Sequence, residues 1–344
     1  MQGEKSAVKF AGHHILGIGQ FDRAEVDRIF EVADRMRPYA QRERKTSVLE
    51  GAILGSMFFE PSTRTRISFG SAFNLLGGHV RETTGFESTA IAKGESLYDT
   101  ARVLSGYSDA IVMRHPTAGS VREFASASRV PVINGGDGSN EHPSQALLDL
   151  YTIRSELADR QRGIDGLRIA MVGDHRFGRT VHSLSRLLTR FNNVSVSLVA
   201  PSELKMPGEL VDEMRANGIE VVQTDQLEAG IANVDIVYST RIQEERFESQ
   251  ADADLYRGRF RLNQSIYTAF CEPNTVIMHP LPRDSREGAQ ELDVDLNDDP
   301  NLAIFRQSDN GVLVRMALFA LILGVADQVD DYSSPVSWST ERRF

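Results

Sequence analysis

The segment 58–66, FFEPSTRTR, places hydroxyl and guanidinium groups directly after a strongly apolar run. Ser62 is a good N-cap residue, and the apolar residues after it are spaced as in a helix. A helix that begins at a strand end offers free backbone N–H groups and the positive end of its dipole to an anion. The hydroxyls of Thr63 and Thr65 add donors, and Arg64 supplies a planar fork for phosphate oxygens. Capping explains Ser62 but not two arginines in a first turn, so this segment predicts a phosphate site.

Two further polar motifs follow apolar runs. His142, Pro143 and Gln145 begin a second predicted helix in the segment 135–150, GGDGSNEHPSQALLDL, and Arg114 ends the run DAIVMR. His142 and Gln145 are three residues apart, so both can face one cleft. The alternative for His142 is a purely structural histidine. In open α/β sheets ligands bind at the carboxyl ends of the strands, which is where all three motifs fall.

Arginines also follow two later apolar runs. Arg179 comes after LRIAMVGD, and Arg241, Gln243 and Arg246 come after VDIVYS. Two arginines at strand ends suit a dicarboxylate, because each guanidinium can bind one carboxylate in a bidentate manner. The alternative is that they are surface arginines in loops.

Short apolar runs alternate with segments of helical periodicity along the chain, which is the pattern of an α/β protein. We expect two doubly wound domains, each with a central parallel sheet flanked by helices. The polar segment 159–166 is expected to be a linker near a domain boundary at Leu150. An apolar helix over 310–325 must be buried, and the polar tail after it is expected to be loosely ordered. The predicted strands are 53–59, 109–114, 130–134, 167–173, 194–200, 219–222, 234–239 and 274–279.

The totals set limits on function. A length of 344 residues favours two domains. The formal net charge of −10 argues against general nucleic-acid binding, so an anion must be captured in a local basic pocket. The single cysteine, Cys271, excludes a disulfide framework and a Cys-rich zinc site and suggests the reducing cytoplasm. No apolar run is typical of a signal peptide or a membrane span. No metal site is expected, because His13 and His14 lack further ligands at a suitable spacing.

Four motifs occur together in the order and spacing of the aspartate/ornithine transcarbamylase family: S-T-R-T-R at 62–66, R-H-P at 114–116, H-P-S-Q at 142–145 and H-P-L-P at 279–282. The resemblance covers roughly residues 10–325. It implies that a first domain, 1–150 plus 306–344, binds carbamoyl phosphate, with the last helix returning to it. The second domain, 151–305, would bind the amino acid.

The resemblance implies transfer of a carbamoyl group from carbamoyl phosphate to the α-amine of L-aspartate, a step of pyrimidine biosynthesis, without a cofactor. The residues implied to bind carbamoyl phosphate are Ser62, Thr63, Arg64, Thr65, Arg114, His142 and Gln145. Those implied to be catalytic are Arg64, Thr65, Arg114, His142 and Lys93. Those implied to bind aspartate are Lys93, Arg179, Arg241, Gln243, Pro280 and Leu281. Glu60 and Arg246 resemble the family's pair that forms when the domains close. An ornithine enzyme would typically carry Cys in place of Pro280.

The segment 85–100, GFESTAIAKGESLYDT, matches the family's loop that reaches into a neighbouring subunit's site. Lys93 matches its lysine, and either Ser88 or Thr89 supplies its hydroxyl; a flexible charged loop is the alternative. The resemblance therefore implies a homotrimer with shared active sites. The sequence leaves open whether a regulatory chain or a dihydroorotase partner binds. It also leaves two alternatives for the function: the chain is a carbamoyltransferase for another amino acid, or it is a catalytically silent assembly subunit.

Overall fold

The structure is a computed structural model that describes residues 10–85, 94–244, 247, 249, 255–286 and 288–338. The chain divides into two compact units, Met1–Ser144 with Gly311–Phe344, and Gln145–Asn310. Both divisions fall inside helices, α6 (Pro143–Ala158) and α12 (Ile304–Ile322). Among the described residues, no helix combines the length and the apolar character needed to cross a bilayer.

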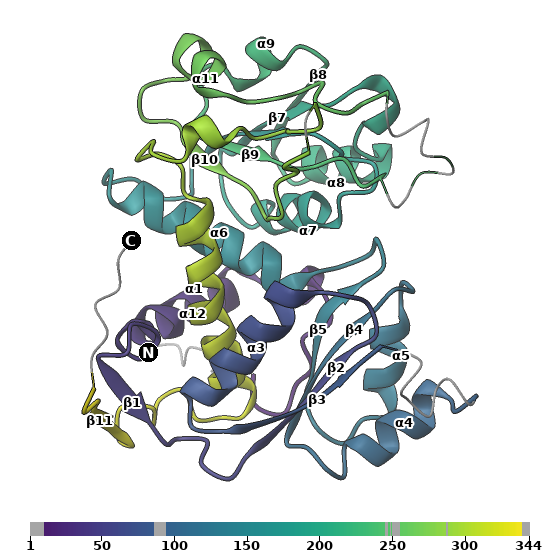
Figure 1. Cartoon of the computed structure of the whole chain (residues 1–344), viewed down its shortest axis with the longest axis vertical. Helices are drawn as coiled ribbons and strands as arrows, with labels where there is room; N and C mark the ends of the chain where they lie inside the picture. Colours follow the sequence, from purple (N-terminus) through teal and green to yellow (C-terminus); the bar gives the residue numbers. More distant parts are fainter. Residues whose placement is uncertain are drawn as a thin grey trace, which may run out of the picture. The chain divides into compact units, whose positions relative to one another are not determined.

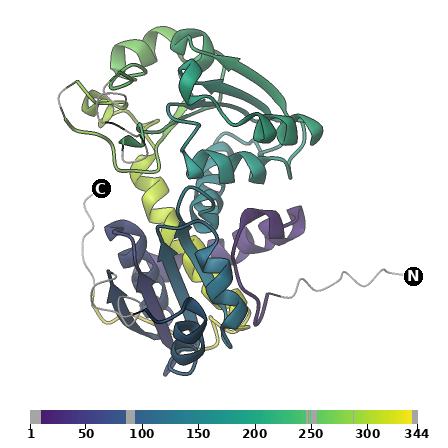
Figure 2. The same ribbon diagram turned by 90° about the vertical axis from the view of Figure 1, so that its right-hand side faces the viewer.

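The first unit is built on a parallel sheet with the strand order β3-β2-β4-β5 (Figure 1). Helix α3 connects β2 to β3, and α5 connects β4 to β5, in opposite directions along the sheet. Right-handed crossovers therefore place α3 and α5 on opposite faces, and helices cover both faces in Figure 2. The elements are α1 (Arg23–Arg35), α2 (Arg37–Ala40), β1 (Arg44–Thr46), β2 (Ile53–Phe58), α3 (Thr63–Leu75), β3 (His79–Thr84), α4 (Leu97–Leu104), β4 (Ala110–His115), α5 (Ser120–Ala127), β5 (Val132–Asp137) and β11 (Ser333–Pro335).

Helix α12 packs on α3 in this unit. The ring of Phe319 meets the rings of Phe69 and Phe73 edge to face, with centroids 5.9 and 4.9 Å away. All three rings are fully buried. Edge-to-face pairs of this kind add to the hydrophobic gain from burial. The first turn of α3 is thus held on a rigid, aromatic base.

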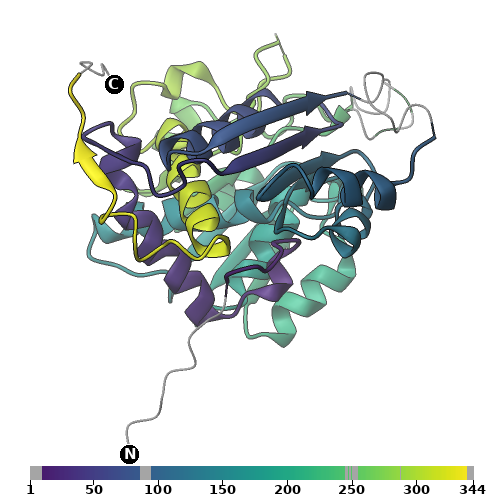
Figure 3. The same ribbon diagram turned by 90° about the horizontal axis from the view of Figure 1, so that it is seen from below.

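The segment after α12 is ordered through residue 338, so the expectation of a loose tail was wrong for that stretch. Strand β11 pairs antiparallel with β1 (Figure 3). Asp327 binds Arg28 at 2.7 Å, and Val329 is buried. Polar composition did not reveal this, because the acidic side chains are bound by arginines of α1 that lie about 300 residues earlier.

The second unit contains a parallel sheet with the order β10-β9-β6-β7-β8. The chain runs outward from β6 through α7 and α8, and then returns to the other side of β6 as β9 and β10. This reversal makes the unit doubly wound. The predicted fold class is therefore confirmed. The elements are β6 (Arg168–Val172), α7 (Arg179–Leu188), β7 (Ser195–Val199), α8 (Gly208–Ala216), β8 (Glu220–Thr224), α9 (Leu227–Ile231), β9 (Ile236–Ser239), α11 (Gln264–Phe270) and β10 (Val276–Met278).

Each predicted strand overlaps an observed one, but β3 was not predicted. The sequence of β3, HVRETT, is too polar to stand out as an apolar run. The segment 159–166 connects α6 to β6, and its Arg162 binds the buried carboxylate of Asp235 at 2.6 Å. Burial opposes ionisation of Asp235, but hydrogen bonds from Arg162 and Arg168 prevail and lower its pKa to about 2.

Candidate functional site

In the first unit the chain continues from β2 toward one edge of the sheet and from β4 toward the other. The strand order therefore reverses between β2 and β4. These strands are direct neighbours, and their connections run to opposite sides of the sheet. The carboxyl ends of two such strands leave a crevice in which ligands bind in α/β proteins. Glu60 and the start of α3 follow β2, and Arg114 lies near the end of β4. The fold thus brings two of the sequence motifs to one edge of one sheet.

The first turn of α3 is open to an anion. Ser62 occupies the N-cap position with extended backbone (φ −161°), but its hydroxyl accepts no hydrogen bond from the helix. The first turn also contains no acidic residue. Thr65 is buried, whereas Arg64 is exposed. No side chain therefore caps the N–H groups of this turn, and no carboxylate within the turn repels an anion that approaches them.

The two arginines of this turn differ in their surroundings, since Arg64 is exposed and Arg66 forms an ion pair with the sheet. Arg66 binds the carboxylate of Glu82 on β3 at 2.6 Å. Its ion pair with Glu82 therefore explains the presence of Arg66, and the prediction of an anion site depends on Arg64.

Arg114 is nearly buried and is held by two groups. Its Nε lies 3.0 Å from Oε2 of Glu60, and its Nη1 donates to the carbonyl of Gly135 at 3.3 Å. Glu60 was expected to pair with Arg246, which lies outside the described residues. In this structure Glu60 pairs with Arg114, across the crevice between β2 and β4.

The loop that carries His142 is organised by Asp137, which the sequence analysis did not single out. Its buried carboxylate accepts hydrogen bonds from the side chains of Asn134 and Asn140 and from the backbone N–H groups of Gly119 and Glu141, at 2.9 to 3.1 Å. These bonds tie the loop after β5 to the loop after β4. They position His142, which is buried directly before α6.

His115, next to Arg114, has a structural role. Its Nδ1 accepts from the N–H of Thr117 at 3.0 Å, and its ring packs edge-on against Phe59. Burial lowers the pKa of His115, so the ring is neutral near pH 7.

The corresponding reversal in the second unit lies between β6 and β9. Asp174, just after β6, is buried and accepts from the N–H of Gln243 at 3.1 Å and from that of Phe177 at 3.0 Å. Arg241 follows β9, and Arg179 begins α7. Three predicted residues of the amino-acid site, Arg179, Arg241 and Gln243, therefore follow the two neighbouring strands β6 and β9.

The His279–Leu281 segment follows β10, the neighbour of β9. The Nδ1 of His279 accepts from the N–H of Leu281 at 2.8 Å, and its Nε2 lies 2.8 Å from Oε1 of Glu291. Leu281 has a left-handed backbone (φ 56°), which is unfavourable for a branched side chain. The buried imidazole holds this strained conformation in place.

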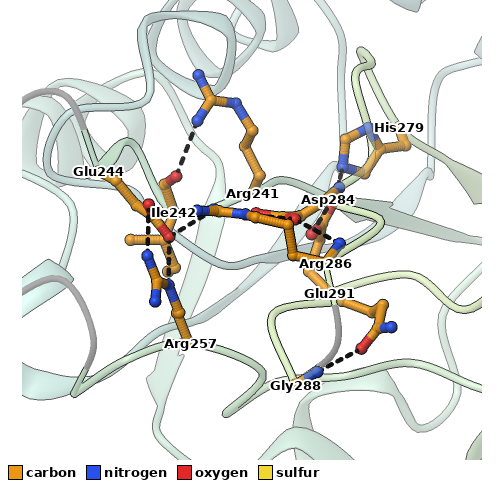
Figure 4. Close-up of polar contacts among 10 residues, drawn as sticks. Arg241, Ile242, Glu244, Arg257, His279, Asp284, Arg286, Gly288 and Glu291 are labelled. Atoms are coloured by element: carbon orange, nitrogen blue, oxygen red, sulfur yellow. Dashed lines mark hydrogen bonds and ion pairs between the residues drawn. The ribbon is translucent and has the colours of Figure 1, made fainter.

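A cluster of charged side chains lies beside Arg241 (Figure 4). Arg257 donates to both carboxylate oxygens of Glu244, at 2.7 and 2.9 Å. Arg286 donates to Glu244 at 2.8 Å and also binds Asp284. The guanidinium of Arg286 lowers the pKa of Asp284. The carboxylates of Glu244 and Asp284 are thus bound by other cations, which reduces their repulsion of an incoming dicarboxylate.

Glu244, Arg257 and Asp284 of this cluster line, together with Arg241, a cavity of about 20 Å³, enough for a single water molecule. The sequence analysis missed this cluster, because charged residues in polar loops carry no periodic signal. Two predicted elements cannot be placed, because Lys93, Ser88, Thr89 and Arg246 lie outside the described residues.

His175, next to Asp174, gives a pH-dependent prediction. It is fully buried, and burial with the nearby His182 lowers its pKa to about 3. The unfolded chain therefore binds more protons than the folded one between pH 3 and 6.5, and stability falls as the pH drops through 6.5. We expect this residue to cost about 1.4 kcal/mol of unfolding free energy between pH 7.5 and 5.5.

A His175→Leu variant is expected to lose that part of the acid destabilisation. The measurement is urea unfolding of wild type and variant at both pH values, with the exposed His13→Leu as control. An equal loss of stability in wild type and His175→Leu would contradict the prediction.

Comparison with known proteins identifies the family. The model for the carbamoyl-phosphate binding domain of aspartate/ornithine carbamoyltransferase matches residues 13–155, and that for the Asp/Orn binding domain matches 165–322. The aspartate carbamoyltransferase catalytic subunit of Saccharophagus degradans is 72% identical over 337 residues, covering 98% of this chain and 100% of the relative. The same-named subunit of Methanocaldococcus jannaschii is 41% identical over 310 residues, covering 90% and 97%.

Solved structures agree. Aspartate transcarbamoylase from Trypanosoma cruzi, in complex with aspartate and phosphate, has a TM-score of 0.82 at 36% identity, covering 91% of this chain and 96% of that one. The catalytic subunit of M. jannaschii aspartate transcarbamoylase has a TM-score of 0.81 at 40% identity, covering 92% and 98%. The resemblance drawn from the four motifs is confirmed, and the chain belongs to the aspartate/ornithine carbamoyltransferase family.

Proposed function

We propose that this chain transfers the carbamoyl group of carbamoyl phosphate to the α-amine of L-aspartate, giving N-carbamoyl-L-aspartate and phosphate for pyrimidine biosynthesis. The observation that carries the proposal is the pair of strand-order reversals, each with arginines at the adjacent strand ends: Arg64 and Arg114 in the first unit, Arg179 and Arg241 in the second. The names of close relatives support it. Residues 1–150 with 306–344 form the carbamoyl-phosphate domain and 151–305 the aspartate domain in this proposal.

The first turn of α3 binds the phosphate. Its unoccupied N–H groups and the side chains of Ser62, Thr63, Arg64 and Thr65 supply the donors. As the amine nitrogen bonds to the carbonyl carbon, the bond from that carbon to the phosphate oxygen breaks, and the proton that the amine loses passes to the departing phosphate. Donors that are already in place lower the barrier, because they need no reorganisation as charge moves onto the oxygens.

The carbonyl oxygen is polarised by Thr65, Arg114 and His142. Arg114 pairs with Glu60 through Nε in this structure, and a guanidinium carries further N–H donors on its two Nη atoms, so it can donate to the carbonyl oxygen while it stays paired. Glu60 pairs with Arg246 on closure in this proposal. Gln145 contacts the carbamoyl amide.

The aspartate carboxylates are bound by Arg179 and Arg241, with Gln243, Pro280 and Leu281 completing the site. Asp174 supports this arrangement, because it fixes the backbone at Gln243. The His279 imidazole supports the backbone at Leu281 in the same way. Lys93 of a neighbouring subunit adds a further positive charge.

The chain acts as a homotrimer with shared active sites in the cytoplasm. The first unit exposes large apolar side chains that an assembly could cover, namely Ile67, Tyr98, Val103 and Tyr107. The word "subunit" in the relatives' names also supports assembly. A regulatory chain or a dihydroorotase partner would bind to this trimer.

The test of the proposed function is phosphate release measured with carbamoyl phosphate and a panel of amines. We expect L-aspartate to be preferred over L-ornithine by at least about 100-fold in kcat/KM, because the arginine-lined site repels an ammonium group. Arg241→Ala is expected to raise the KM for aspartate at least about tenfold, through loss of a charge-assisted hydrogen bond.

Binding of carbamoyl phosphate to Arg241→Ala is expected to be unchanged. The control is Arg186→Ala, because Arg186 lies on α7 and pairs with the partly exposed Glu213. A preference for ornithine would overturn the choice of substrate.

A further inference from the structure

Asp149 is a fully buried carboxylate on α6 that receives three hydrogen bonds. Nε2 of Gln145 donates to it at 2.8 Å, Nε2 of Gln307 at 2.6 Å, and the hydroxyl of Tyr238 at 2.7 Å. All four residues belong to the second unit. Burial and the Asp149 charge raise the pKa of Tyr238, so its hydroxyl keeps the proton that it donates. Three donors from three different segments of this unit therefore converge on one buried carboxylate.

The Asp149 carboxylate is the acceptor in all three of these hydrogen bonds, so it fixes which end of each amide faces it. Both glutamines must present their NH₂ groups to Asp149. Gln307 shows the consequence: its Oε1 is turned the other way and accepts the N–H of His279 at 2.9 Å. For Gln145, one turn before Asp149 on the same helix, the carbonyl oxygen is likewise directed away from the carboxylate.

We infer that Asp149 is a positioning residue that makes Gln145 a hydrogen-bond acceptor toward the donor substrate, and so selects a carbamoyl group over an acyl group. The inference rests on the proposed contact between Gln145 and the carbamoyl amide. The NH₂ of carbamoyl phosphate donates to an acceptor, whereas the methyl group of acetyl phosphate, which has nearly the same shape, cannot. A site built to pair with an N–H group discriminates strongly against an analogue that lacks it.

The same carboxylate also reaches the backbone beyond β10. Asp149 accepts from the side-chain amide of Gln307, whose oxygen accepts from the backbone N–H of His279. The His279 ring in turn accepts from the backbone N–H of Leu281. Leu281 belongs to the proposed aspartate site. One buried carboxylate thus supports both the side chain proposed to bind the carbamoyl amide and a backbone segment of the aspartate site.

The test compares Asp149→Asn with wild type for two ligands of the same shape. Asparagine can donate as well as accept, so it no longer forces the Gln145 amide into one orientation. We expect the ratio of the acetyl phosphate inhibition constant to the carbamoyl phosphate dissociation constant to fall at least about tenfold. Inhibition by inorganic phosphate, which is bound by the first unit, is expected to stay within about twofold of wild type. Should Asp149→Asn fail to fold, Asp149→Ser carries the same expectation.

Two further variants separate the outcomes. Tyr238→Phe is the matched control, because it removes one hydrogen bond from the same carboxylate but leaves both glutamines held; its selectivity is expected to remain that of wild type. Gln145→Ala is expected to lose selectivity. If Gln145→Ala loses the selectivity for carbamoyl phosphate but Asp149→Asn and Asp149→Ser keep it, the inference is overturned and the proposed function stands. If Gln145→Ala keeps this selectivity, both the inference and the proposed contact of Gln145 are wrong. A loss in Tyr238→Phe equal to that in Asp149→Asn would show a general packing effect and also overturn the inference.

Discussion

Arg64→Ala is expected to lower kcat/KM for carbamoyl phosphate by at least about 100-fold, because a charge-assisted, forked contact is lost where charge develops on the leaving phosphate. Arg64 lies in the first turn of α3, beside N–H groups that no side chain caps. Steady-state kinetics with varied carbamoyl phosphate give the number, and sedimentation confirms that assembly is intact.

Arg66→Ala is the matched control for this prediction. It removes the same side chain two residues away, but Arg66 is bound to Glu82 and serves the packing of α3 on β3. We expect a small change in stability and nearly unchanged kinetics, since partly exposed ion pairs contribute about 1 kcal/mol or less. Near-normal kinetics in a folded Arg64→Ala protein would remove the assignment of the 62–66 segment as the phosphate site.

The second large effect concerns assembly. Lys93→Gln and His142→Ala are each expected to be nearly inactive, because each lacks one half of a site shared between two subunits. In the proposed trimer, Lys93 acts in the neighbour's site as a point charge, whereas His142 belongs to the chain's own pocket. When equal amounts of the two variants are dissociated and reassembled together, about one quarter of the interfaces pair an intact pocket with an intact loop.

The mixture is therefore expected to regain about one quarter of wild-type activity. Each variant taken through the same dissociation alone is the control and should stay inactive. Subunit exchange is followed independently with a charge-tagged chain. Hybrids that exchange subunits but remain inactive would mean that Lys93 acts within its own chain or has no part in the reaction.

The sequence alone determined the fold class and the family, because both depend on local patterns. Apolar runs that end in polar motifs predict parallel strands with ligand groups at their carboxyl ends, and four such motifs together are specific. The same locality explains what was missed. Strand β3 is polar because much of it is solvent-exposed, and the tail after α12 is ordered by arginines of α1 rather than by its own residues.

Only the tertiary structure decided which polar side chains are available to ligands. Arg64 and Arg66 look alike in sequence, but residues two apart on a helix point in different directions, and only Arg66 meets the carboxylate on β3. Asp149 reads as one acidic residue in an apolar helix. Its partners Tyr238 and Gln307 are 89 and 158 residues away, so this hydrogen-bond network exists only once the chain has folded. Local periodicity encodes burial and helix or strand type, whereas hydrogen-bond partners are set by contacts between distant segments, for which one sequence carries no pattern.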